Sequence, residues 1–143
     1  MSKTLNYFTH RIPFKLKDKR KITKWLTGVI ESFGKIAGSI NIIFVGDKYL
    51  RNINKIYLGE TKFTDTISFP LSEEENIVSG DIYISVERIK DNAKRYGTTS
   101  KNELYRVMVH SVLHLVGFSD LTKRQKRVMR TSEDKFLRQI AKV

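Results

Sequence analysis

The order of strand-like and helical segments along this chain most constrains its fold, because the strand-like segments end near residue 85 and only helical segments follow. Alternation and β-branched content predict strands at 3–8, 39–46, 63–69 and 80–85. Helical spacing of apolar residues predicts helices at 18–34, from 47 to about 57, and at 86–96, 101–116 and 122–141. Strands mixed with helices, followed by helices alone, predict an α+β fold in which about five helices pack on a four-stranded mixed sheet.

Boundary residues support these segments. Asp18 and Asp47 stand where an aspartate can cap the first turn of a helix. Gly97 and Gly117 stand where a glycine in the left-handed conformation ends one. In the last predicted helix we expect four residues to face the core: Val128, Met129, Phe136 and Ile140.

Composition narrows the class of protein. The chain has 143 residues without a repeat or linker-like tract, so we expect one domain over 1–143. It has no cysteine, which excludes disulfides and thiolate metal sites. No apolar run approaches the roughly twenty residues that span a bilayer, and the first ten residues lack the apolar core of a secretory signal. We therefore expect a cytoplasmic protein without a membrane segment; its oligomeric state is left open.

The chain is strongly basic, with 27 Lys and Arg against 15 Asp and Glu, and its net charge is +12. Most of the excess lies in two clusters: Lys15, Lys17, Lys19, Arg20, Lys21 and Lys24, and then Lys123, Arg124, Lys126, Arg127 and Arg130. Such a field attracts polyanions, of which nucleic acid is the commonest inside cells. A merely solvated surface is the alternative. An anionic membrane is disfavoured, because neither cluster lies opposite a wide apolar face.

Two of the three histidines, His110 and His114, are four residues apart in an apolar helical segment. That spacing places both imidazoles on one helix face, near the C-terminal end whose partial negative charge favours a cation. Gly117 predicts a turn that brings Asp120 back as a third ligand. Two imidazoles and one carboxylate leave a fourth tetrahedral position open, as in catalytic zinc sites.

The histidine pair has other possible interpretations. Two histidines at this spacing can be ordinary helix residues. Zinc proteases carry a glutamate directly after the first histidine, where this chain has Ser111, so that mechanism is excluded. Two histidines and a carboxylate also occur in non-haem iron oxygenases, but the chain shows no jelly-roll run of strands.

Three segments together resemble one family. HSVLHLVGFSD (110–120) resembles the H-G-x-L-H-L-x-G-Y-D-H signature of the YbeY family of bacterial endoribonucleases. TDTISFP (64–70) and GDIYIS (80–85) resemble that family's T-D-V-L-S-F-P and G-D-I-x-I-S. The resemblance implies the α+β fold, one Zn²⁺ per chain, cleavage of single-stranded RNA, and a role in maturation of the 16S rRNA 3′ end and quality control of the small ribosomal subunit.

Residue by residue, the resemblance implies that His110 and His114 take the first two metal positions, and that Asp120 replaces the family's usual third histidine. Leu58 stands where many members have an arginine that is thought to contact substrate. RNA contacts are then expected from other basic residues: Lys62, Lys123, Arg124, Arg127 and Arg130.

Two further aspartates have either a structural or a supporting role. Asp65, with Thr64, could cap a strand end, and Asp81 could be a turn residue after Gly80. Either carboxylate could instead orient a ligand histidine by a hydrogen bond. The sequence does not indicate which residue acts as a catalytic acid or base. The sequence is therefore compatible with two functions: a metal-dependent endoribonuclease, and a non-catalytic, zinc-stabilised RNA- or ribosome-binding assembly factor.

Overall fold

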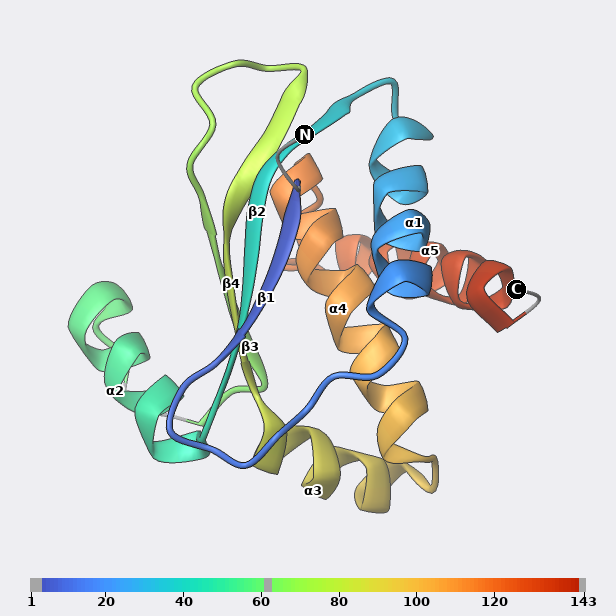
Figure 1. Cartoon of the computed structure of the whole chain (residues 1–143). Coiled ribbons are helices and arrows are strands. Elements are labelled where there is room, and N and C mark those ends of the chain that lie inside the picture. Colours follow the sequence, from blue (N-terminus) through green and yellow to red (C-terminus); the bar gives the residue numbers. More distant parts are fainter. Residues whose placement is uncertain (1–3, 61–62, 142–143) are drawn as a thin grey trace.

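The strands form a single mixed sheet in the computed structural model, which describes residues 4–60 and 63–141 (Figure 1). They are β1 (Leu5–Thr9), β2 (Ile36–Val45), β3 (Thr66–Pro70) and β4 (Ile77–Ser85). Their order across the sheet is β1-β2-β4-β3. β1, β2 and β4 run parallel, and β3 pairs antiparallel with β4 at one edge.

Helices lie on both faces of this sheet. They are α1 (Lys19–Glu31), α2 (Asp47–Leu58), α3 (Val86–Tyr96), α4 (Ser100–Val116) and α5 (Lys123–Ala141). α2 lies alone on one face, while α1, α4 and α5 lie on the other (Figure 1). The predicted α+β class, with four strands and five helices over the described residues, is confirmed.

Strand alternation divides the apolar residues between two cores. Ile42 of β2 and Ile82 of β4 are fully buried in the larger core, against α1 and α4. Their neighbours Ile43 and Tyr83 point the other way and pack on the small core under α2. From Ile40 onward in β2, and in β4, even-numbered apolar residues therefore face the larger core and odd-numbered ones the small core; a register shift between Ala37 and Ile40 breaks this alternation earlier in β2.

α4 runs across the larger core and is held close to the sheet. A Cβ on Gly80 would lie 2.5 Å from the Phe69 carbonyl oxygen and 2.8 Å from a methyl of Leu115, so only glycine permits this approach of β4 and α4. The hydroxyls of Thr66 on β3 and Ser111 on α4 also hydrogen-bond at 2.8 Å. These contacts fix α4 relative to the edge of the sheet.

Several boundaries differ from the predicted ones. Asp18 precedes α1, but its backbone is left-handed (φ 61°) and its side chain makes no capping bond. Asp47 is the first residue of α2 and does not cap it, because its carboxylate accepts from Ser85 Oγ and Arg88 Nη2 instead. β2 and β4 begin three residues earlier than expected, and β3 begins at Thr66. Long-range pairing, which local sequence does not encode, sets these ends.

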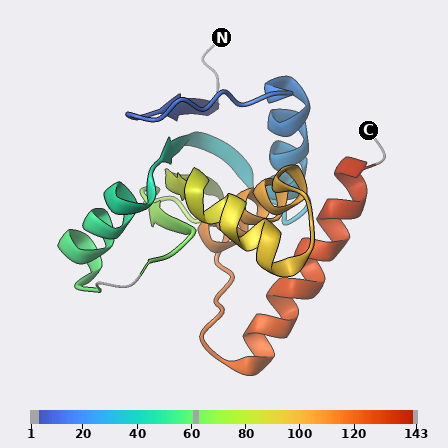
Figure 2. The same cartoon turned by 90° about the horizontal axis from the view of Figure 1, so that it is seen from below.

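α5 packs across α4 and α1. The connection from α4 reaches outward before α5 returns toward α1 (Figure 2). Trp25 of α1 donates to the Phe136 carbonyl at 2.8 Å. Met129, Phe136 and Ile140 are buried as predicted, whereas Val128 is half-exposed and the expectation for it is wrong. Within the described residues, no helix is both long and apolar enough to span a membrane.

Candidate metal centre

The two histidines of α4 point toward each other. His110 and His114 lie one turn apart, and their rings meet edge to face with centroids 4.6 Å apart. Their Nε2 atoms are 3.0 Å apart. Both rings are partly buried, so they face a shielded space instead of bulk water.

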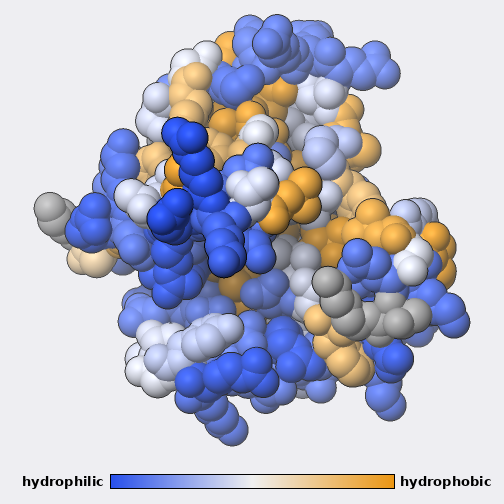
Figure 3. All heavy atoms as spheres, turned by 180° about the vertical axis from the view of Figure 1, so that it is seen from behind, coloured by the Kyte–Doolittle hydropathy of each residue, from blue (hydrophilic) through white to orange (hydrophobic). Residues whose placement is uncertain are grey.

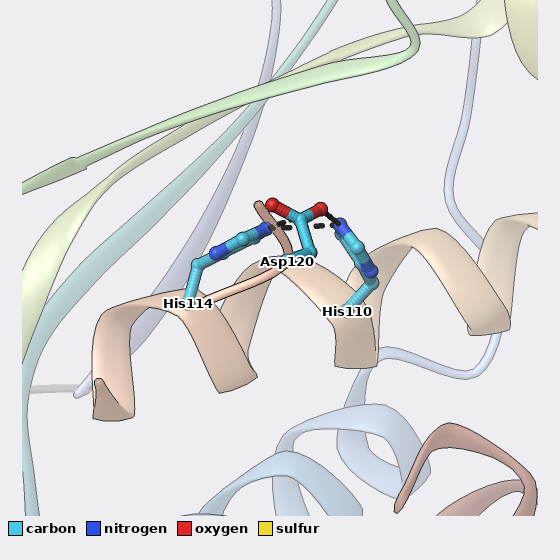
Figure 4. Close-up of side chains that lie close together, drawn as sticks. All are labelled: His110, His114 and Asp120. Atoms are coloured by element: carbon cyan, nitrogen blue, oxygen red, sulfur yellow. Dashed lines mark hydrogen bonds and ion pairs between the residues drawn. The ribbon is translucent and has the colours of Figure 1, made fainter. Parts of the chain in front are cut away.

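A sharp turn brings a carboxylate to the same point. Gly117 ends α4 with a φ of +125°, which favours glycine, and its N–H donates to the Leu113 carbonyl. The chain then folds back so that Asp120 Oδ2 lies 3.4 Å from His114 Nε2 and 3.6 Å from His110 Nε2. The three side chains converge on one point from α4 and the loop after it (Figure 4).

The second nitrogen of each ring has a fixed acceptor. His114 Nδ1 lies 3.0 Å from the carbonyl oxygen of Phe118, and His110 Nδ1 lies 2.6 Å from Oε2 of Glu133. Both oxygens accept, so both Nδ1 atoms donate N–H, which leaves the Nε2 atoms of the two rings facing each other. Burial lowers the pKa of His110, but the hydrogen bond and charge of Glu133 outweigh it and raise the pKa above its usual value.

The donor set fits a tetrahedral divalent metal ion. Ligand bonds of about 2.0–2.1 Å at tetrahedral angles separate two donor atoms by about 3.3 Å. The three distances here are 3.0, 3.4 and 3.6 Å. Among the residues that the structure describes, His110, His114 and Asp120 are the one group of three or more whose ligand atoms approach closely enough to hold an ion.

Glu133 is the functional residue that sequence reasoning missed. It is only 4% exposed, and its other oxygen, Oε1, accepts from Arg106 Nη1 at 2.8 Å. A signal was present, since Glu133 shares the α5 face that Met129, Phe136 and Ile140 bury. An acidic residue on an apolar helix face requires a buried partner.

Asp65 and Asp81 occupy different surroundings. Asp65 lies just before β3 and lines the same cavity as His110, and its carboxylate accepts from Asn92 at 3.5 Å and from the backbone N–H groups of Asp65 and Thr66. Burial raises the pKa of Asp65, and the nearby His110 offsets part of the rise. Asp81 shares the α2 side of the sheet with Tyr83 and accepts from Asn41 at 3.0 Å. The expectation that Asp81 orients a ligand histidine is therefore corrected.

A cavity of about 920 Å³ opens beside the candidate metal centre between α4 and α5. Its lining includes His110, Asp120 and three basic residues of α5, which are Lys126, Arg130 and Arg138. The other expected RNA contacts on α5 are exposed but outside this lining: Lys123, Arg124 and Arg127. Seen from behind, strongly hydrophilic side chains gather over this part of the molecule (Figure 3). Lys62 lies outside the described residues, and Leu58 is an exposed residue at the end of α2.

Comparison with known proteins agrees with this geometry. The family model described as Endoribonuclease YbeY matches residues 7–141. Proteins named Endoribonuclease YbeY from Flavobacterium johnsoniae and Cytophaga hutchinsonii are 42% and 37% identical over 127 and 131 residues, covering 89% and 92% of this chain and 91% and 92% of theirs. A solution structure of a Thermotoga maritima protein has the same fold, with a TM-score of 0.65 and 22% identity over 95% of this chain and 88% of that one. The chain therefore belongs to the YbeY family of endoribonucleases.

Proposed function

We propose that this chain is a single-strand-specific endoribonuclease whose metal ion, Zn²⁺, is held by His110, His114 and Asp120. The observation that carries the proposal is the convergence of two imidazole nitrogens and a carboxylate oxygen within 3.0–3.6 Å, with both histidines locked by acceptors at Nδ1. Three protein ligands leave a fourth position open, which distinguishes catalytic zinc sites from structural ones. When bound, such an ion activates water and stabilises negative charge on a phosphodiester.

The residues around the centre have separate roles in this proposal. Glu133 keeps the His110 ring in the tautomer that presents Nε2. Arg130 and Lys126 line the cavity beside the ligands and attract the phosphates of a single strand toward them. Lys123, Arg124 and Arg127 extend this positive surface along α5. Asp65 acts on His110 through its charge.

The biological role follows the family resemblance. Maturation of the 16S rRNA 3′ end and quality control of the small ribosomal subunit are proposed for this chain on that basis. The substrate is then ribosomal RNA in the cytoplasm, and the single domain spans residues 1–143.

A second function, an RNA- or ribosome-binding assembly factor without catalysis, is favoured by one observation. Leu58 stands where many family members have an arginine that is thought to contact substrate. In that case the same metal stabilises the fold, and RNA binding survives without cleavage.

One experiment separates the two functions. Protein stripped with a chelator and reloaded with Zn²⁺, Mn²⁺ or Mg²⁺ is assayed on a single-stranded RNA for binding and for cleavage. The endoribonuclease cleaves only after reloading, and His114→Ala abolishes cleavage while largely sparing binding. His10→Ala is the matched control, because it changes the one histidine outside the centre. Binding without cleavage under every metal supports the assembly factor, and cleavage that persists in His114→Ala refutes the proposed centre.

A further inference from the structure

The cavity beside the metal centre contains one carboxylate without a partner. Its wall carries five acidic residues: Asp65, Glu103, Asp120, Glu133 and Asp134. Asp65 accepts from Asn92, Asp120 approaches the two histidines, and Arg106 binds both Glu133 and Asp134. Within residues 4–60 and 63–141, no hydrogen bond or ion pair reaches the carboxylate of Glu103, although this residue is only 6% exposed.

The charge of this carboxylate is disfavoured by its surroundings. Burial raises the pKa of Glu103, the charge of Asp65 adds to the rise, and Arg106 and Arg130 offset part of it. Within the described residues, Arg88 Nε is the one buried side-chain nitrogen or oxygen without a hydrogen-bond partner, so the carboxylate oxygens of Glu103 remain open to the cavity that this residue lines. The side chain is therefore poised to accept hydrogen bonds from something that enters the cavity.

Its place along α4 relates it to the metal centre. Glu103 precedes His110 by seven residues, which is two helical turns, so the two lie on one face at a separation of about 10.5 Å along the helix axis. Both line the same cavity. A nucleotide adjacent to the one at the metal centre can therefore reach Glu103.

The surroundings select the chemical class of the ligand. The same wall sets six basic residues against these five acidic ones, which favours the phosphates of an anionic partner over a cation; the basic residues are Lys21, Lys101, Arg106, Lys126, Arg130 and Arg138. Glu103 is not part of the one close group of three metal-ligating side chains among the described residues, so a metal ion is not the indicated occupant. A neutral group with N–H donors, attached to an anionic backbone, fits both features. A base of single-stranded RNA has this chemistry.

Among the bases, an acceptor-only carboxylate favours guanine. Its two oxygens can accept from N1–H and from the N2 amino group, which lie side by side on the Watson–Crick edge of guanine. Adenine and cytosine offer one amino group next to a ring acceptor, and uracil one N–H between two carbonyls. We propose that Glu103 forms a guanine-recognising subsite for RNA, next to the metal centre. This subsite rests on the proposed function, because RNA must enter the cavity.

The test measures binding without cleavage. Oligouridines that carry a single guanosine, inosine or adenosine are titrated against protein with the His114→Ala change, with and without Glu103→Gln. Wild-type Glu103 is expected to prefer guanosine over adenosine by roughly 10-fold, toward the low end for a bidentate base contact. Inosine, which lacks the N2 amino group, should fall between them. Glu103→Gln should abolish the preference, because its amide presents one acceptor and one donor.

Controls separate this inference from the proposed function. Glu31→Gln makes the same chemical change at an exposed position of α1 and should keep the preference. Glu103→Gln removes a buried charge without changing shape, so circular dichroism should show a folded protein. Equal affinity for the three oligonucleotides, or a guanosine preference that survives Glu103→Gln, overturns the subsite while RNA binding stands. Protein that binds none of them overturns the proposed RNA substrate and the subsite together.

Discussion

Arg106 and Glu133 make a buried ion pair that should couple fold stability to the metal centre. Arg106 on α4 donates to Glu133 Oε1 at 2.8 Å and to Asp134 Oδ1 at 2.7 Å on α5. The other oxygen of Glu133 accepts from His110 Nδ1 at 2.6 Å. Glu133 is 4% exposed, so its charge depends on these partners instead of water. Removing Arg106 should therefore affect both the packing of α5 on α4 and, through Glu133, the position of His110 in the metal centre.

The size of the effect follows from burial. Removing one partner of a buried pair typically costs about 3–5 kcal/mol, since the other charge stays buried. The Arg106 side chain is 23% exposed, and His110 still donates to Glu133, so Arg106→Ala should lower the free energy of unfolding by about 3 kcal/mol. The double variant Arg106→Ala/Glu133→Gln removes both charges of this pair and should recover about 2 kcal/mol of that loss.

The metal centre supplies a second readout. Glu133→Gln keeps the shape of the side chain but removes the charge that holds the His110 tautomer. Metal affinity should then fall about 10-fold, at the low end for loss of a carboxylate behind a ligand histidine. Urea denaturation of metal-free proteins measures the stability, and competition with a chromophoric chelator measures the affinity. Arg124→Ala, which changes an exposed arginine of α5 outside the cavity lining, is the control for both.

Two results would refute this reasoning. Additive effects of Arg106→Ala and Glu133→Gln on the free energy of unfolding would mean that the two charges do not stabilise each other. Equal metal affinity in wild type and Glu133→Gln would mean that the carboxylate does not support His110. Wild-type protein that binds no metal would instead refute the proposed centre itself.

Three other predictions test the centre, the RNA surface and the fold. Asp120→Ala should weaken metal binding and Asp120→His should keep or raise it; equal chelator competition by wild type and Asp120→Ala would remove Asp120 from the centre. A triple alanine variant of α5 should flatten the salt dependence of RNA affinity by about 2 in the log–log slope, with metal content unchanged, whereas an unchanged slope would leave these residues as solvated surface. Its changes are at Lys123, Arg127 and Arg130. Gly80→Ala should destabilise the fold by about 1–3 kcal/mol, because the added methyl overpacks against Phe69 and Leu115. Gly28→Ala, which has open space around it inside α1, should stabilise the fold by about 0.5–1 kcal/mol. Thermal unfolding measures both variants, and equal shifts of the midpoint would contradict the packing argument.

The sequence predicted those features that local chemistry determines. The four-residue spacing of His110 and His114 places them on one face of any helix, and Gly117 supplies the turn that returns Asp120. The end points of β2, β3 and β4 were less accurate, because strand ends depend on pairing between distant segments. Asp47 shows the same limit, because Arg88 near the start of α3 donates to the carboxylate that the sequence predicts as the cap of α2.

Tertiary contacts explain the errors around the centre. Side chains alternate along β4, so Asp81 shares the face of Tyr83, away from α4. The sequence predicts this alternation, but it does not reveal which face of the sheet α4 covers. Val128 and Met129 are neighbours with opposite exposure, which the exact rotation of α5 against α4 decides. Glu133 required the same information, because its partners lie 23 and 27 residues earlier in the chain.

α5 contributes to both halves of the proposed chemistry. Its buried face supplies Glu133, which holds the tautomer of His110, and its exposed Arg130 lines the cavity through which phosphates would approach. These two residues are three positions apart on a rigid helix, so the carboxylate behind the ligand and the cation ahead of the substrate keep a constant separation. Arg106 joins α4 to this helix beside the same cavity. A change that shifts α5 should therefore weaken metal binding and RNA binding together, whereas a change confined to its exposed charges should weaken RNA binding alone.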